Sequence, residues 1–423
     1  IEKLSEPVIQ FWKIVMMESM KYNYSMHALN TTIYEKSKIY EIVSNRTIAE
    51  IEQNYRCNES VKDTTSNYES RIPKSFDHNE KGPHRLSGEN RQEIDTVYKS
   101  MNKDFMWKLE SGRYVEEVLY KIGLNLTYEH NVHSFIIDAE DETIKKHFDE
   151  RELEEISDAS GPLVPNLSDD VIEYLKKFLN KKSIKEIRQT INEKDDRFDV
   201  DYDKEVYHDL DYIPLVREIE NAHLDCENLE QWYNCHIWNA IFDQSFGNMK
   251  EISVVRTANV TRKNSTRVLN TKRWIIRTNN EGNKIEFGYG EVGKTWVDKS
   301  GTKFLREVSL KSLKALKDML IDLMRTCKWN PDAQSKLQTV GVVHSGLAMM
   351  VIRMDNPKGY VCRVNRSNIM EVPHSEENFS DILEILAAVL NLKSIVKHTM
   401  KIVDMKSVLS EKMAVETFLQ AGL

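Results

Sequence analysis

Cysteine is scarce in this chain, and the few that occur form no recognisable motif. The 423 residues include five cysteines, none of them spaced as Cys-x-x-Cys or as zinc ligands. A small, odd number of cysteines is typical of reduced thiols in a reducing compartment. The pattern argues against a disulfide-stabilised secreted protein and against a structural zinc site. We therefore expect an intracellular protein of the cytoplasm or the nucleus.

Long hydrophobic runs are also missing. No stretch of 18 consecutive apolar residues occurs, so the sequence predicts no transmembrane helix and no membrane partner. The sequence does not begin with Met, so we expect that it could be a fragment of a longer chain. Its first residues also lack the basic-then-apolar pattern of a signal peptide. With 40% hydrophobic and 30% charged residues, the chain can bury a core and remain water-soluble. Its length suits two or three domains.

An overall excess of positive charge is absent, yet the charge is unevenly distributed. The net charge of −8 argues against a uniformly basic nucleic-acid binder. From Asp138 to Asp211 there are 23 acids against 12 Lys and Arg, a net charge of −11. From Glu251 to Val340 there are 18 Lys and Arg against 9 acids, a net charge of +9. The second segment therefore predicts an anion-attracting surface in the C-terminal half.

The N-terminal half is mainly helical by its pattern. Apolar residues recur at helical spacing over 7–55, and a polar stretch poor in apolar residues follows. Ser111 is expected to cap a helix that runs to Tyr120. The apolar run 133–138 suggests a short strand, and Ser168 is expected to cap a helix over 168–190.

From residue 228 onward the pattern becomes that of an α/β domain. The expected elements run helix, three strands, helix, strand, followed by further strands and a last helix. They cover 228–246 (an aromatic helix), 252–255, 274–278, 285–292, 305–327 (helix), 339–343, 347–354, 360–364, 369–372 and 379–400 (helix). Turns are expected at 279–283 and at 355–359, where Asn, Gly and Pro gather.

These patterns predict five segments and an α/β (α+β) fold, in which a helical N-terminal region precedes a mixed sheet flanked by helices. The segments are 1–57 (helical), 58–95 (a polar linker, disordered by composition), 96–212 (helical and acidic), 213–404 (the α/β domain) and 405–423 (a C-terminal helix).

Several segments, taken in order, carry a family resemblance. They are Ser111–Tyr120, His133–Asp138, the helix around Trp238, Phe287–Glu291 and Lys314–Leu320. Together, over about residues 98 to 400, they resemble an uncharacterised protein group expanded in Mucor-like and arbuscular-mycorrhizal fungi. The C-terminal portion of that group resembles PD-(D/E)xK nucleases, which have a restriction-endonuclease-like fold. The resemblance implies a mixed sheet flanked by helices.

The resemblance also implies a defined chemistry. In such nucleases an Asp on the second core strand and a Glu on the third hold Mg²⁺ or Mn²⁺ for phosphodiester hydrolysis. A Lys two residues beyond that Glu shares its face of the strand and stabilises negative charge. In this chain Glu291 matches the Glu best, as catalytic residue and metal ligand, and Glu286 ranks lower. Gly293 stands where the Lys is expected, Lys294 follows one place later, and no Asp occurs near Lys272. The implied metal site is therefore degenerate.

Basic residues beside this site are candidates for nucleic-acid binding. The segment from Arg256 to Arg277 contains no acid and seven basic residues, namely Arg256, Arg262, Lys263, Arg267, Lys272, Arg273 and Arg277. It is either a solvated loop or an arm that contacts phosphates. Lys311, Lys314 and Lys317 share one helix face, which either solubilises the helix or extends the arm.

These observations support two functional hypotheses. The first is a nuclease-like domain that binds DNA or RNA, with degenerate metal-dependent phosphodiesterase activity. The second is a non-enzymatic, effector-like protein-interaction module that reuses the nuclease fold as a scaffold. Fold analogy alone cannot separate them. Trp232 and Trp238 could stack on bases, although aromatic residues at helical spacing are typical of a core.

Overall fold

A computed structural model describes residues 85–193, 213–225, 228, 230–247, 249, 252–257, 272–278, 284–293 and 302–421. One compact unit comprises residues 1–12, 86–258 and 270–423, and a second comprises 13–85 and 259–269. The architecture below is that of the first unit. The helix expected at 7–55, the linker up to residue 84 and the turn at 279–283 lie outside the described residues.

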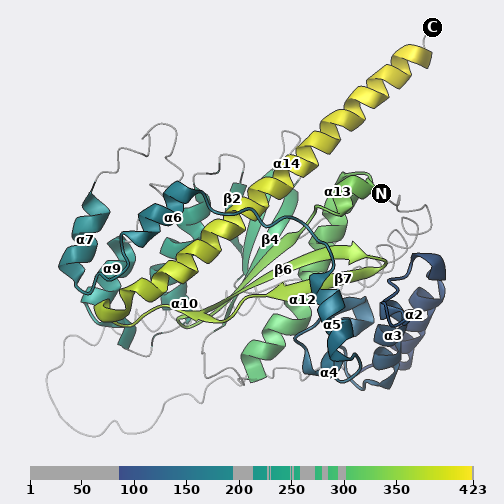
Figure 1. Ribbon diagram of the computed structural model, residues 1–423, viewed down its shortest axis with the longest axis horizontal. Coiled ribbons are helices and arrows are strands. Elements are labelled where there is room, and N and C mark those ends of the chain that lie inside the picture. The colour runs from purple at the N-terminus through teal and green to yellow at the C-terminus, as the bar shows by residue number, and fades with distance from the viewer. Residues whose placement is uncertain are drawn as a thin grey trace, which may run out of the picture. The chain divides into compact units, whose positions relative to one another are not determined.

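Eight strands within the described residues form one mixed sheet. Their order is β1-β7-β6-β5-β4-β3-β2, and β8 also pairs with β6 (Figure 1). The strands are β1 (Ile136–Asp138), β2 (Ile252–Thr257), β3 (Lys272–Thr278), β4 (Lys284–Gly293), β5 (Thr339–Ser345), β6 (Ala348–Lys358), β7 (Val361–Arg366) and β8 (Met370–Glu371). This confirms the α/β class and the sheet flanked by helices.

The strand directions follow from the connections. β2, β3 and β4 are consecutive antiparallel neighbours. β4 and β5 are parallel, because the long helix α12 (Thr302–Thr326) returns the chain between them. β5, β6 and β7 are again antiparallel, and β1 is parallel to β7.

The turn predicted at 355–359 begins later in the structure than the sequence suggests. β6 continues to Lys358, and the chain reverses at Gly359, whose φ of 60° suits glycine.

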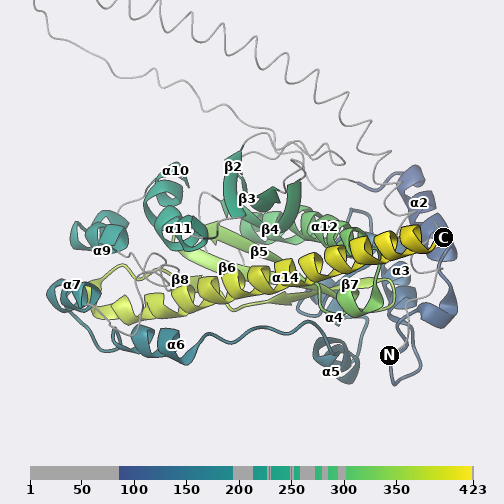
Figure 2. The same ribbon diagram turned by 90° about the horizontal axis from the view of Figure 1, so that it is seen from above.

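Two long helices cover opposite faces of the sheet, α12 on one and α14 (Ile382–Ala421) on the other (Figure 2). The apolar stripe of α12, including Leu313, Leu316 and Leu320, is fully buried. A Cβ on Gly341 of β5 would lie 3.0 Å from Cδ1 of Leu316, so this glycine lets α12 approach the sheet closely. The C-terminal helix expected at 405–423 is not separate, because it continues α14.

Shorter helices make up the rest of the unit. They are α2 (Gly88–Lys99), η1 (Lys103–Phe105), α3 (Val115–Asn125), η2 (Asn131–Ser134), α4 (Glu142–Lys145), α5 (Glu150–Asp158), α6 (Asp169–Lys176), α7 (Ile184–Asn192), α9 (Ile213–Glu220), η3 (His223–Asp225), α10 (Glu230–Tyr233), η4 (Asn234–Asp243), α11 (Gln244–Gly247), α13 (Pro331–Gln334) and η5 (Glu376–Asp381). None of the helices in these described ranges is both long and apolar enough to cross a membrane.

Three expectations for helix boundaries were wrong, and side-chain bonds explain each. Helix α2 begins at Gly88, inside the expected linker, because Ser87 and Asn90 cap each other. Ser111 does not cap α3, since its hydroxyl donates to Glu152 at 2.6 Å and the helix begins at Val115.

The third wrong boundary is the single helix expected over 168–190. It is divided into α6 and α7, because the chain takes a left-handed conformation at Asn180 and Ser183 caps a new helix. Ile172 and Leu179, which the apolar spacing of a single helix would place inside, are exposed.

The expected boundary at residue 213 does not divide the sheet. The run 133–138 contains β1, as expected, and β1 is parallel to β7 from the far end of the chain. Asp138 at the end of β1 is paired with Arg366 at 2.5 Å. Burial raises the pKa of Asp138, while Arg366 opposes that rise. Residues of the acidic region and of the α/β domain therefore share one sheet.

The aromatic helix expected at 228–246 is present, and its middle part is not an ordinary α-helix. Residues 234–243 form a π-helix between two short α-helices. Trp238 is fully buried, its indole N–H donates to the Gly346 carbonyl at 2.9 Å, and it stacks on His344 at 4.1 Å. The core interpretation of Trp238 is thus confirmed.

Candidate functional site

Glu291 lies near the end of β4 and is buried beneath α12. In the backbone register its partners are Lys272 on β3 and Val343 on β5. The side chain is only 8% exposed. Its Oε2 accepts hydrogen bonds from the Ser312 hydroxyl of α12 at 2.8 Å and from the Tyr289 hydroxyl at 3.0 Å. Glu291 therefore joins the sheet to its covering helix.

Glu286, the second candidate acid, is also buried but lies elsewhere on β4. Its register partner is Ile276, and the pairing of β3 with β4 shifts between Ile275 and Ile276. Five residues of extended strand span roughly 16 Å, well beyond the size of one ion's coordination shell. Glu286 and Glu291 are therefore not brought together around a single metal ion.

The structure does not bring together a set of side chains that could form the expected metal site within the described residues. Lys294, the candidate catalytic lysine, lies outside the described residues. Within the part of the chain that is described, no group of three or more His, Cys, Asp or Glu side chains is arranged to hold a metal ion. Glu291, the residue expected to hold Mg²⁺ or Mn²⁺, accepts hydrogen bonds from two hydroxyl groups at Oε2.

The basic segment is partly described. Arg262, Lys263 and Arg267 lie outside the described residues. The backbone register places Arg256 of β2 opposite Arg273 of β3, and Thr257 opposite Lys272. β2 is the last strand of the sheet in the part that the structure describes. Backbone pairing thus concentrates basic positions at one edge of the sheet.

Arg277, at the other end of β3, has a different environment. It is 8% exposed and its Nη1 lies 2.7 Å from Oδ1 of Asp404 on α14. Its guanidinium also lies 5.8 Å from the centre of the Phe287 ring. Arg277 therefore anchors α14 to the sheet instead of extending the basic edge into solvent.

The three lysines of α12 do not form one exposed face. Lys311 is exposed. Lys314 forms an ion pair with Glu129, and Lys317 is buried and donates to the Ser134 carbonyl. Burial lowers the pKa of Lys317. Two of the three therefore bind α12 to the segment around η2, which the helical spacing alone does not predict.

Sequence reasoning missed a cluster around Glu218 of α9. Its two carboxylate oxygens contact Nδ1 of His223 at 2.6 Å and Nδ1 of His236 at 3.1 Å. The Trp232 ring stacks on His236 with ring centres 4.8 Å apart. Burial raises the pKa of Glu218, but the two histidines outweigh burial and leave that pKa below its usual value. The cluster ties α9 to the π-helix.

Comparison of the chain with protein-family models, with curated proteins and with solved structures gave no match.

Proposed function

We propose that the C-terminal part of this unit binds the phosphates of a nucleic acid through the basic edge, which we define as β2 and β3. The sequence that connects the two strands adds Arg262, Lys263 and Arg267. The observation that carries the proposal is the register that sets Arg256 opposite Arg273, with Lys272 beside them. Like charges at directly opposed strand positions destabilise a sheet. Phosphate groups bound along the edge would neutralise that charge, and basic residues interleaved with Thr, Ser and Asn suit phosphate contacts.

The order of the elements supports this proposal. A helical segment (α10, η4 and α11) leads into β2, β3 and β4, and α12 then leads into β5. This α-β-β-β-α-β order is consistent with the resemblance to PD-(D/E)xK nucleases. The basic edge lies on the first two of these strands, next to the strand that carries Glu291.

We further propose that phosphodiester hydrolysis has been lost. A catalytic carboxylate must present its oxygens to a metal ion and the substrate. Oε2 of Glu291 instead accepts two hydroxyl hydrogen bonds beneath α12, Gly293 occupies the position of the expected Lys, and β3 carries no Asp. The side chain of Glu291 thus contributes packing and hydrogen bonds, which a fold retained as a binding scaffold still needs.

The salt dependence of binding tests the proposal. For duplex DNA the logarithm of the binding constant falls with the logarithm of salt concentration by about 0.9 per phosphate contact. Replacing Arg262, Lys263 and Arg267 by Ala should weaken binding and make this slope shallower by roughly 2 to 3. The double variant Arg256→Gln, Arg273→Gln should act in the same direction. Fluorescence anisotropy with labelled DNA and RNA over a salt series measures both quantities.

A control with the same change in net charge makes the result specific. Lys176, Lys182 and Lys185 are exposed and lie around α6 and α7. Replacing all three by Ala should leave the slope unchanged. If the two triple variants behave alike, or if wild type shows no salt-sensitive binding, the basic edge is not a nucleic-acid interface. The alternative, a protein-interaction module on the nuclease-like scaffold, would then be favoured.

A further inference from the structure

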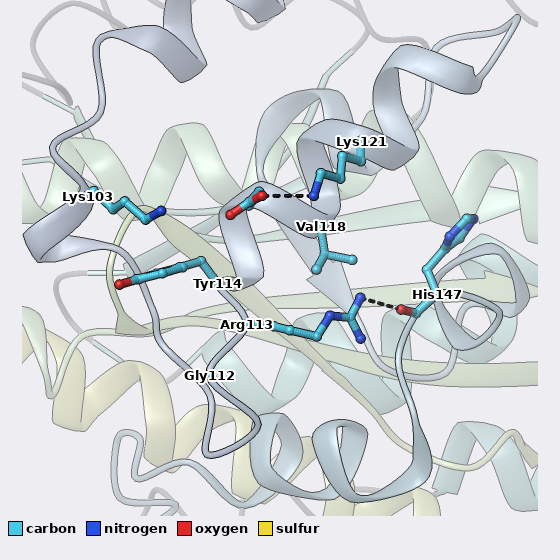
Figure 3. A pocket seen from close by; sticks show the side chains of 8 residues that line it. Lys103, Gly112, Arg113, Tyr114, Val118, Lys121 and His147 are labelled. Carbon is cyan, nitrogen blue, oxygen red and sulfur yellow. Dashed lines mark hydrogen bonds and ion pairs between the residues drawn. The ribbon is translucent and has the colours of Figure 1, made fainter.

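The described residues form a pocket at the start of α3, about 320 Å³ in volume. Its walls include Lys103, Arg113, Tyr114, Val118, Lys121 and His147 (Figure 3). They come from η1, the turn before α3, α3 itself and the residues just after α4, and none belongs to the basic edge. The volume is at the small end of the range for small-molecule sites, about 300 to 1,000 Å³.

The pocket gathers positive charge. Its walls contain three permanent cations, Lys103, Arg113 and Lys121, and the one acid among them is Glu117. Lys121 is 67% exposed and pairs with Glu117 at 2.8 Å. The ammonium of Lys103 lies 4.9 Å from the centre of the Tyr114 ring, and within the described residues it makes no ion pair. Lys103 can thus receive an anion from solvent directly, whereas an anion that contacts Lys121 competes with Glu117 for its ammonium.

The third cation is held in place. Arg113 donates from Nη1 to Glu152 at 2.6 Å. Its Nη2 donates to the His147 carbonyl at 2.9 Å (Figure 3). These bonds fix the guanidinium as part of the wall, with Glu152 partly offsetting its charge. The pocket lies beside the N-terminal end of α3, where the helix dipole favours negative charge and Glu117 of the first turn supplies part of it. Charge and geometry therefore both favour a negatively charged group.

The pocket also has an apolar side. The Tyr114 ring lines it beside Lys103, and Val118 lines it beside Lys121 (Figure 3). An aromatic ring beside cations suits a ligand that joins a phosphate to a planar ring, because stacking and ion pairing then act together. The small volume limits such a ligand to one ring and one phosphate.

We propose that this pocket binds a phosphate monoester attached to a nucleoside. Lys103 and Lys121 contact the phosphate, Arg113 completes the cationic wall, and the base packs on Tyr114. The ligand is either a free nucleoside monophosphate or the 5′-phosphate end of a strand, which share this chemistry. The site is independent of the basic edge and does not require the function proposed for it.

Calorimetric titration of the full chain with AMP, adenosine and inorganic phosphate tests the pocket. We expect saturable binding of AMP that is at least about tenfold tighter than that of adenosine, because only AMP carries the charge. Lys103→Gln and Lys121→Gln should each weaken AMP binding by about tenfold. Tyr114→Leu should weaken AMP binding more than phosphate binding. Lys99→Gln is the matched control, since Lys99 makes the same i,i+4 ion pair, with Asp95, outside the pocket.

Binding of oligonucleotides that carry a 5′-phosphate or a 5′-hydroxyl distinguishes a free nucleotide ligand from the 5′ end of a strand. AMP binding that depends on Lys103 and Lys121 identifies a free nucleotide. Preference for the 5′-phosphate strand without AMP binding, lost in the same variants, identifies a strand end. The proposal is overturned if none of these phosphates binds saturably, or if both lysine variants bind as Lys99→Gln does. The alanine variants of Arg262, Lys263 and Arg267 should leave this binding unchanged, so either proposal can fail alone.

Discussion

Replacing Arg363 by Met is expected to destabilise the folded unit by about 3 to 5 kcal/mol. Arg363 and Asp355 are each only 6% exposed, and two hydrogen bonds of 3.1 and 2.6 Å join them. The remaining nitrogen of the guanidinium, Nη1, donates to the carbonyls of Ile156, Ser157 and Ala159 at the end of α5. Removing the cation leaves a buried carboxylate and three carbonyls without their donor, and methionine can offer none.

Urea denaturation of matched variants measures this effect. Arg188→Met is the control, because Arg188 and Glu220 form an ion pair that is 41% and 45% exposed. Such exposed pairs contribute about 0 to 1 kcal/mol. The double variant Arg363→Met, Asp355→Leu should recover part of the loss, since it removes the uncompensated charge. Equal losses in Arg363→Met and Arg188→Met would mean that the buried pair does not hold β6, β7 and α5 together.

The stability of the unit is expected to fall as pH rises from 5 to 8, in part through Glu116. Burial raises the pKa of Glu116 to about 7, although the backbone N–H groups of Tyr360 and Trp107 donate to it, each at 2.9 Å. In the unfolded chain the group titrates near 4.5. Between these values the folded state holds a proton that the unfolded state has lost. A rise in pH therefore favours unfolding, by up to about 3 kcal/mol above pH 7.

Comparison with Glu116→Gln isolates this contribution. Glutamine resembles the protonated acid and cannot ionise, so the unfolding free energy of the variant relative to wild type should increase by about 2 to 3 kcal/mol from pH 5 to 8. Glu140→Gln, at an exposed position, should run parallel to wild type. A constant difference between Glu116→Gln and wild type over this range would show that the buried carboxyl does not titrate there.

The strands, α12 and the first part of α14 could be predicted because their patterns are local. Alternating apolar residues and the leucine stripe of α12 are each read within one element. Interactions across the chain could not be predicted in this way. Ser111 binds Glu152 instead of capping a helix, and β1 joins β7 more than 200 residues later. Neither partner is marked in the sequence.

The sequence predicts which types of residue occur at the candidate site, but it does not predict how their side chains are arranged. The basic character of the segment 256–277 is evident from the sequence, as is the absence of an Asp near Lys272. The burial of Glu291 depends on Ser312, which lies 21 residues away on a helix whose rotation over the sheet no spacing specifies. The pocket at α3 depends on four segments that meet only in the folded unit, with a few basic residues as its sole sequence signal.

A combined binding and cleavage assay distinguishes a nucleic-acid-binding scaffold from an active nuclease. Wild type and Glu291→Gln are incubated with single- and double-stranded DNA and RNA, in Mg²⁺ or Mn²⁺ and in their absence. Because the carboxylate of Glu291 is engaged with Ser312 and Tyr289, we predict that both proteins bind in a salt-sensitive manner and that neither cleaves. Metal-dependent cleavage by wild type that is abolished in Glu291→Gln would contradict this account and establish an active nuclease.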